Sequence, residues 1–282
     1  MRNISYLNHN RPLEYPIPNM QQPTSPIGIF DSGVGGLSIL KAIRKQLPNE
    51  NLLYIADSAN APYGDRDPAF ISKRALEIAD FLYQANAKAI VVACNTATVV
   101  AIDALRANFT IPIVAVEPAI KPAAAVTRSG VVAVLATSRT LASSSVARLC
   151  ERYGDGIKLM LQPCPGLVEQ IERGQLASKQ TLMLLESYLQ PVLAAGADTI
   201  VLGCTHYPFL EPQIRAIAGN AVTILDSAEA VARQLQRIIS QTNPNNTGSY
   251  AEDFFITTGD TAATGELISN LWGSHAEVKP MI

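Results

Sequence analysis

The sequence predicts an α/β protein built from two similar three-layer lobes, with mostly parallel sheets and an active site in the cleft between them. Short apolar runs of strand length alternate with stretches of helix length along almost the whole chain. This alternation is typical of parallel sheets with right-handed crossovers. The pattern restarts near residue 131, and each half reaches a cysteine where its third strand ends. Such an internal repeat favours two similar units that face each other.

The expected strands are short runs rich in Val, Ile and Leu, as in sheets that are buried on both faces. They are expected at 27–30, 51–56, 88–93 and 113–116, and then at 131–135, 157–161, 199–202, 222–225 and 254–257. Polar residues follow most of these runs at once. Ligands of open α/β sheets bind at such carboxyl strand ends, so these ends are where the functional residues are expected.

Prolines, glycines and capping residues set the bounds of the expected helices. Pro48 ends one helix, Pro68 lies in the first turn of another, and Gly174 ends a third. Thr96 or Thr98 is expected to cap the helix that follows the first cysteine strand. Helices are expected at about 37–47, 68–84, 179–195 and 228–240. Two more are expected to end near residues 107 and 152, and others to begin near residue 167 and after residue 208. A last helix is expected near the C-terminus.

These elements divide into two lobes and an arm. Lobe 1 is expected to comprise residues 26–118 plus 226–282 and to carry Cys94, and lobe 2 to comprise residues 119–225 and to carry Cys204. Residues 1–25 contain several prolines among Asn and Gln, which favours an extended or disordered arm. The arm is interpreted as a solvated tail, with a docking or regulatory role as the alternative.

Composition excludes several classes of function. The net charge is −2 and the pI about 6.0, with Lys and Arg scattered, so no nucleic-acid partner is expected. No apolar run has the length of a membrane helix, and no basic segment precedes an apolar one at the N-terminus. The 4 cysteines form no CxxC pair and only 3 histidines accompany them. We therefore expect a cytoplasmic protein with free thiols and no metal.

Cys94 and Cys204 suggest chemistry on two faces of one carbon atom. Each ends an apolar run and is followed at once by small polar residues. If the lobes face each other, one thiolate can remove a proton while the other thiol donates one from the far side, which inverts a stereocentre. Helix N-termini and polar backbone at these strand ends are expected to lower the pKa of the thiols.

The residues next to the two thiols are suited to assist this reaction. Ser32, Asn95, Thr96, Thr205 and the N–H groups around Gly33 can stabilise a developing carbanion. The two cysteines also have a simpler structural interpretation, because a cysteine that ends a strand is often just a small buried side chain.

Two titratable residues are predicted to support one thiol each. Asp31 ends the first strand and is expected to hold or relay a proton for Cys94. His206 follows Cys204 by two residues and is expected to serve that thiol. The alternatives are a turn-forming aspartate and a packed histidine. Cys150 and Cys164 are interpreted as structural.

Four sequence blocks resemble the signature blocks of the glutamate racemase family, within the cofactor-independent Asp/Glu racemases. They are Phe30-Asp31-Ser32-Gly33-Val34-Gly35-Gly36, Pro62-Tyr63-Gly64, Ala93-Cys94-Asn95-Thr96-Ala97 and Gly203-Cys204-Thr205-His206-Tyr207-Pro208. The resemblance runs from about residue 26 to the end of the chain. It implies an isomerase without cofactor that interconverts L- and D-glutamate and supplies D-glutamate for peptidoglycan in the cytoplasm.

The resemblance also implies roles for individual residues. Cys94 would be the base for D-glutamate and Cys204 the base for L-glutamate, with Asp31, His206 and Glu172 as further catalytic residues. Glu169 is the alternative to Glu172, since the local match fits both. Substrate contacts are implied for Asp31, Ser32, Asp57, Tyr63, Gly64, Asn95, Thr96, Thr205 and His206.

Two partners follow from the resemblance besides the substrate. Family members are usually homodimers. Some relatives carry an N-terminal extension and depend on UDP-N-acetylmuramoyl-L-alanine as activator, but the arm over 1–25 does not clearly match that pattern.

Other interpretations are weaker. A racemase of the same fold acting on aspartate or hydantoins cannot be separated by composition. A dinucleotide enzyme would need glycine where Ser38 stands and would place Asp31 against the pyrophosphate. A periplasmic amino-acid binding protein would need a secretory signal. A pyridoxal enzyme would need a lysine at a comparable strand end, and Lys121 is the nearest.

Overall fold

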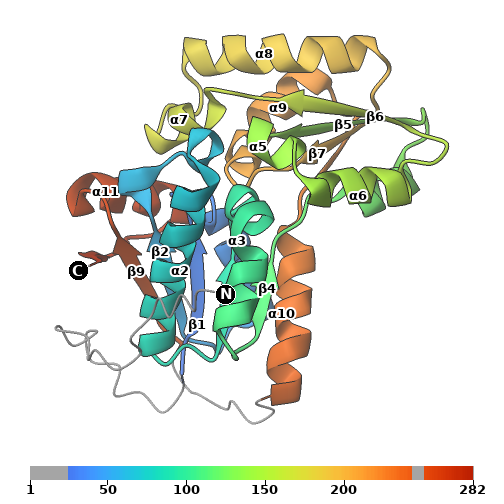
Figure 1. Cartoon of the computed structure of the whole chain (residues 1–282). Coiled ribbons are helices and arrows are strands. Elements are labelled where there is room, and N and C mark those ends of the chain that lie inside the picture. Colours follow the sequence, from blue (N-terminus) through green and yellow to red (C-terminus); the bar gives the residue numbers. More distant parts are fainter. Residues whose placement is uncertain (1–24, 243–250, 282) are drawn as a thin grey trace.

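The computed structural model describes residues 25–242 and 251–281, which form two α/β units stacked one above the other (Figure 1). The predicted fold class is confirmed, because the strands form one sheet of six and one of four and every pair described is parallel. We call the unit with the larger sheet lobe 1 and the other lobe 2. The arm predicted for residues 1–25 lies almost wholly outside the described residues.

The sheet of lobe 1 has the strand order β10-β9-β2-β1-β3-β4. Its central strands are buried along their whole length, which explains their continuous apolar sequence. The strands are β1 Ile27–Asp31, β2 Leu52–Ala56, β3 Ala89–Val92, β4 Ile113–Ala115, β9 Asp253–Thr257 and β10 Val278–Pro280.

The sheet of lobe 2 has the order β6-β5-β7-β8. Its strands are β5 Val131–Ala136, β6 Lys158–Pro163, β7 Thr199–Leu202 and β8 Thr223–Leu225. This order repeats the order β2-β1-β3-β4 inside the larger sheet, so the sequence repeat is also a repeat of topology. Cys94 and Cys204 follow β3 and β7, which are equivalent strands in the two lobes.

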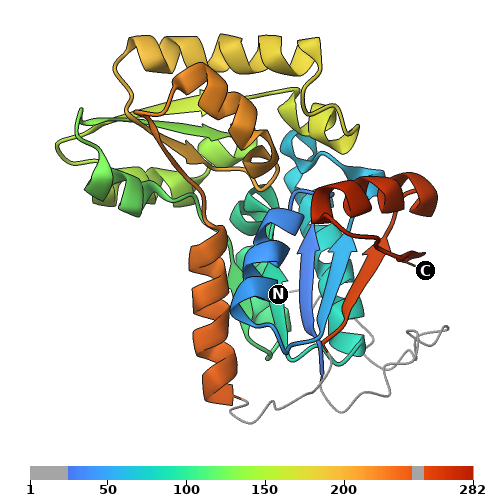
Figure 2. The same cartoon turned by 180° about the vertical axis from the view of Figure 1, so that it is seen from behind.

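Helices cover both faces of each sheet. In lobe 1, α2 and α3 pack on one face (Figure 1) and α1, α10 and α11 on the other (Figure 2). In lobe 2, α4 and α6 pack on one face, and α7, α8 and α9 on the other. The helices are α1 Leu37–Gln46, α2 Pro68–Gln84, α3 Asn95–Asn108, α4 Ile120–Val126, α5 Ser138–Leu141, α6 Ser144–Tyr153, α7 Leu167–Glu172, α8 Lys179–Ala194, α9 Glu211–Ala218, α10 Ala228–Thr242 and α11 Thr261–Trp272, with 3₁₀ turns η1 Ser58–Asn60, η2 Tyr63–Asp65 and η3 Tyr207–Leu210. None of the described helices is long and apolar enough to cross a membrane.

The chain crosses between the lobes twice, and the two crossings lie side by side. It enters lobe 2 after β4 and returns to lobe 1 between β8 and α10. The hydroxyl of Ser227 in the second crossing donates a hydrogen bond to the carbonyl of Glu117 in the first. These paired crossings connect the lobes beside the cleft that carries the thiols.

The structure differs from the predicted elements in four places. Helix α4 and the short edge strand β10 were not predicted. The helix expected to end near residue 152 is two helices, because the side chain of Ser143 accepts from the N–H of Val146 and starts α6 anew. The cap predicted at Thr96 or Thr98 is wrong, since Cys94 itself caps α3.

Candidate active site

Both predicted thiols line one small cavity where the lobes meet. β3 leads to Cys94 from lobe 1, and β7 leads to Cys204 from lobe 2. The cavity has a volume of about 10 Å³, which is room for about one water molecule. The cleft is therefore closed in this structure. The other lining residues are Ser32, Pro62, Tyr63, Gly64, Asn95, Thr96, Thr137, Val168, Thr205 and His206.

Cys94 is held by neutral donors and acceptors of lobe 1. Its sulfur accepts a hydrogen bond from the N–H of Ala97 at 3.4 Å, and its thiol donates to Ser32 Oγ at 3.6 Å. The first contact is the N-cap of α3, so the thiol lies at the positive end of a helix dipole. Only 4% of the residue is exposed.

The prediction of a lowered thiol pKa is wrong for Cys94 in the closed cleft. Burial, assisted by the negative charge of Asp31, raises the pKa of Cys94 to about 12. The hydrogen bonds from Ala97 and Ser32 act in the opposite direction but are weaker. The helix N-terminus is present as expected. The loss of water outweighs it, because desolvation disfavours the thiolate.

Cys204 has a titratable partner instead. Its sulfur lies 3.8 Å from His206 Nδ1, and His206 Nε2 lies 2.6 Å from Glu172 Oε1. The same carboxylate oxygen accepts from the N–H of Val34 at 2.7 Å, across the cleft in lobe 1. Glu172, not Glu169, is thus the glutamate beside this thiol.

His206 is fully buried between charged neighbours. Burial alone lowers the pKa of His206, but hydrogen bonds with Cys204 and Glu172 raise it, and so do the charges of Cys204 and Asp31. The net direction is well above the ordinary value. The cationic imidazolium is therefore favoured in the closed cleft, where it can stabilise a thiolate on Cys204.

Asp31 connects the lobes. One carboxylate oxygen accepts from the N–H of Gly33 at 2.8 Å and from the Ser32 hydroxyl at 3.3 Å. The other accepts from Thr205 Oγ1 of lobe 2 at 2.9 Å. Burial raises the pKa of Asp31, although His206 and these donors lower it in part. Asp31 reaches Cys94 through the Ser32 hydroxyl rather than by direct contact.

Asp57 lies outside the cavity, unlike the substrate contact expected from the resemblance. Its buried carboxylate accepts from Arg74 Nη2 and Thr258 Oγ1, both at 2.8 Å, and from the hydroxyl of Tyr63. Tyr63 and the adjacent Gly64 do line the cavity. Asp57 thus orients a wall of the cleft. Sequence reasoning missed Arg74 and Thr258, because neither stands out from other polar residues of its element.

Small polar groups line the rest of the cavity. The hydroxyls of Thr96 in lobe 1 and Thr137 in lobe 2 lie 3.0 Å apart, and Thr140 lies within 3.3 Å of Thr96. The Nδ2 atom of Asn95 is buried without a hydrogen-bond partner. Such a donor is available to a ligand in the cleft. Thr137 was not predicted as a site residue, although it directly follows β5 in lobe 2 as Ser32 directly follows β1 in lobe 1.

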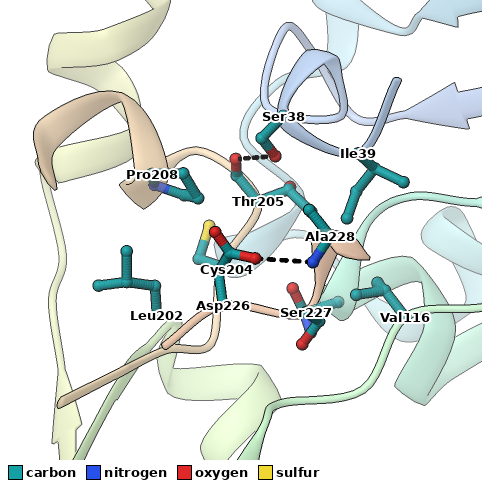
Figure 3. A pocket seen from close by; sticks show the side chains of 11 residues that line it. Ser38, Ile39, Val116, Leu202, Cys204, Thr205, Pro208, Asp226, Ser227 and Ala228 are labelled. Carbon is teal, nitrogen blue, oxygen red and sulfur yellow. Dashed lines mark hydrogen bonds between the residues drawn. The ribbon is translucent and has the colours of Figure 1, made fainter. Parts of the chain in front are cut away.

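A second small cavity lies behind Cys204 (Figure 3). There Ser38 of α1 donates to the carbonyl oxygen of Thr205 at 2.8 Å. The carboxylate of Asp226 accepts from the N–H of Ala228 at 2.8 Å and so starts α10. The turn that carries Cys204 is therefore fixed to lobe 1 from behind as well as from the cleft.

A larger cavity and the other two cysteines do not belong to the cleft. A cavity of about 590 Å³ lies beside the two chain crossings, with Glu117, Lys121, Tyr153 and Arg233 in its lining. Within residues 25–242 and 251–281, no group of three His, Cys, Asp or Glu side chains could hold a metal ion. Cys150 and Cys164 do not line the cavity between the lobes.

Comparisons with known proteins agree with this geometry. The sequence model of the Asp/Glu/Hydantoin racemase family matches residues 27–235. A glutamate racemase of Pseudomonas putida is 48% identical over 261 residues, covering 92% of this chain and 98% of its own. A glutamate racemase of Pseudomonas syringae is 55% identical over 218 residues, which are 77% of this chain and 79% of its own.

Solved structures show the same arrangement. A glutamate racemase isoform of Bacillus anthracis superposes with a TM-score of 0.84 at 32% identity, covering 93% of this chain and 98% of its own. The Escherichia coli glutamate racemase, in complex with L-glutamate and the activator UDP-MurNAc-ala, superposes with a TM-score of 0.81 at 31% identity, covering 92% and 98%.

Proposed function

The chain belongs to the Asp/Glu/hydantoin racemase family, and from that premise we propose that it is a glutamate racemase. It interconverts L- and D-glutamate without a cofactor and so supplies D-glutamate for peptidoglycan and the bacterial cell wall. The observation that carries the proposal is the pair of thiols, Cys94 and Cys204, on opposite walls of one cleft. The relatives described above are glutamate racemases, which favours glutamate over aspartate as the substrate.

In the proposed reaction the two thiols exchange roles. The Cys204 thiolate takes the α-proton of L-glutamate, the electron pair of that bond stays on the α-carbon, and the Cys94 thiol gives its proton to the opposite face. The product is D-glutamate, and the reverse reaction starts from a Cys94 thiolate. Two bases on opposite faces account for inversion without any further reagent.

The neighbours of the thiols are assigned supporting roles. Protonated His206, held by Glu172, stabilises the Cys204 thiolate, and Asp31 acts on Cys94 through the Ser32 hydroxyl. The unpartnered Asn95 amide is a donor for the substrate. Ser32, Tyr63, Gly64, Thr96, Thr205 and His206 complete the contacts, whereas Asp57 acts by orienting Tyr63.

Substrate entry requires the lobes to separate. The cavity of about 10 Å³ is far too small for an amino acid. We propose that residues 26–118 with 226–282 move against residues 119–225 about the paired crossings. Opening readmits water to Cys94, and the substrate ammonium adds an opposite charge on closure. Both changes favour the thiolate that the closed, unliganded cleft disfavours.

The direct test follows the α-carbon. L-Glutamate, and separately L-aspartate, is incubated with the protein in deuterated water, and circular dichroism and mass spectrometry follow optical activity and deuterium uptake. We expect L-glutamate to lose its optical activity with deuterium at the α-carbon, and L-aspartate to stay unchanged. Reaction of L-aspartate alone would establish the aspartate alternative, and no exchange with either amino acid would refute the proposal.

Three further parts of the proposal concern its setting. A homodimer is expected from the family, and light scattering at two protein concentrations tests it, with a monomer at both as the contrary result.

Activation by UDP-N-acetylmuramoyl-L-alanine is suggested by the Escherichia coli relative. Equal turnover with and without the nucleotide would refute it. A cytoplasmic location follows from the proposed supply of D-glutamate and is tested by cell fractionation, with recovery outside the cytoplasm as the contrary result.

A further inference from the structure

The glycines between β1 and α1 are not explained by their own backbone. This turn, Gly33-Val34-Gly35-Gly36, is the part of the sequence that resembles a dinucleotide-binding loop. None of its glycines is among the residues with positive φ in the described chain. Alanine could therefore adopt the same backbone conformation without strain. The requirement for glycine must come from something that packs against the turn.

Two side chains of lobe 2 occupy the space where the missing side chains would lie. A Cβ atom added at Gly33 would overlap Oε1 of Glu172, and one added at Gly35 would overlap Nδ1 of His206. Both distances would be well below 3.0 Å, and real Cβ atoms essentially never approach another heavy atom so closely. Between these glycines, the N–H of Val34 donates to Glu172 Oε1 at 2.7 Å.

Glu172 and His206 belong to separate elements of lobe 2. Glu172 is the last residue of α7, and His206 lies in the turn between β7 and η3. Both converge on one turn of lobe 1, and only 2% of the His206 side chain is exposed. Lobe separation would remove the Val34 N–H from Glu172 and expose both side chains to water.

We propose that Gly33 and Gly35 form a socket in lobe 1 that receives Glu172 and His206 of lobe 2, so that the pair supporting Cys204 is positioned only when the lobes close. The two glycines are positioning residues, because they touch neither thiol by hydrogen bond. The socket couples closure to chemistry: the step that excludes water also completes the Glu172–His206–Cys204 chain. Only this link between lobe closure and catalysis rests on the proposed function.

The test measures closure without using racemisation. Gly33→Ala and Gly35→Ala are compared with the parent protein and with Gly28→Ala. In Gly28→Ala the added Cβ would lie 2.8 Å from Leu82 Cδ2, inside the core of lobe 1. Iodoacetamide alkylation of each cysteine is followed by peptide mapping, with the partly exposed Cys150 as internal reference. Circular dichroism checks the fold of every variant.

We expect the two socket variants to alkylate Cys94 and Cys204 at least about tenfold faster, relative to Cys150, because a shifted opening equilibrium exposes both thiols together. Gly28→Ala should lower the temperature of unfolding and leave the relative alkylation rates unchanged. Unchanged cleft alkylation in both socket variants would overturn the proposal. Equal acceleration in Gly28→Ala would also overturn it, since any strain in lobe 1 would then suffice.

A double variant gives a second, independent reading. In Gly33→Ala with Glu172→Asp, the carboxylate is shorter by one methylene and retreats from the added methyl group. We expect cleft alkylation to fall back toward the parent rate. A double variant as reactive as Gly33→Ala would refute the socket. If alkylation behaves as expected while the parent protein racemises neither amino acid, the socket stands and the proposed function fails.

Discussion

The two thiols of the cleft occupy equivalent positions in a repeated fold, yet their surroundings differ. Cys94 is supported by a helix N-terminus and a serine hydroxyl, which are neutral groups. Cys204 is supported by His206, which is held in turn by Glu172. The strands place both thiols by the same topology, whereas the loops after the strands provide different chemistry.

This difference has a consequence for the two directions of reaction. A buried thiol without a cationic partner stays protonated, as the raised pKa of Cys94 indicates. A thiol beside an imidazolium can hold a negative charge. The closed cleft therefore favours a protonated thiol on Cys94, whereas the imidazolium of His206 is placed to stabilise negative charge that develops on Cys204.

Removing either thiol has the largest expected effect. Cys94→Ser and Cys204→Ser should each lower racemisation in both directions by at least about 10³-fold, because each direction needs one base and one acid. The assay is loss of optical activity of L- and of D-glutamate, with circular dichroism of the protein to verify the fold. Cys150→Ser, in α6 and away from the cleft, is the matched control and should keep parental activity. Normal turnover in both directions by either cleft variant would refute the two-base mechanism.

Removing the support of Cys204 should have the next largest effect. His206→Gln keeps a polar side chain but cannot carry the positive charge, so we expect kcat to fall ~10²-fold. L- and D-glutamate have equal free energies, hence kcat/KM must fall equally in both directions. Isotope effects with α-deuterated substrates resolve the two steps. In His206→Gln the isotope effect should increase with L-glutamate as substrate, because proton transfer to Cys204 becomes rate-limiting. With D-glutamate as substrate it should decrease.

The control for this prediction is His275→Gln, since His275 is exposed and does not line the cavity between the lobes. It should match the parent in rate and isotope effects. A His206→Gln variant whose isotope effects change equally in both directions would show that His206 stabilises the closed cleft as a whole. The asymmetry between the two thiols would then need another cause.

Much of the fold could be predicted because the apolar runs of buried parallel strands are visible in the sequence. The repeat of topology and the converging strand ends followed from that pattern. Helix α4 was missed because Pro122 and a run of alanines carry no amphipathic pattern. Strand β10 was missed because it is only 3 residues long and lies at the sheet edge.

The candidate site was predictable in its membership but not in its electrostatics. Sequence position indicates that Cys94 lies at a helix N-terminus, but not that lobe 2 covers it and removes its water. Arg74 became visible only as the partner of buried Asp57. The sequence disfavoured a dinucleotide-binding loop at the glycines of the first turn, but it did not show that they would lie against Glu172 and His206. Each of these features depends on contacts between segments far apart in the sequence.

The smallest expected effect concerns the charge next to Cys94. The negative charge of Asp31 helps to keep the pKa of Cys94 raised, whereas the Ser32 hydroxyl lowers it. Asp31→Asn should therefore lower the pKa of Cys94, and Ser32→Ala should raise it. Below the pKa the thiolate fraction grows tenfold per pH unit, so a change of about one unit alters alkylation of Cys94 at pH 8 by ~tenfold. The measurement is the alkylation rate of Cys94 between pH 7 and 10.

Alkylation of Cys204 in the same samples separates charge from opening. Asp31 also accepts from Thr205 of lobe 2, so its replacement could loosen the cleft, which would accelerate both thiols at every pH. A charge effect instead moves the pH profile of Cys94 downward in Asp31→Asn and upward in Ser32→Ala. Shifts of the same sign in both variants would contradict the electrostatic account. The two walls would then differ in accessibility, and the neutral surroundings of Cys94 would not be what holds its proton.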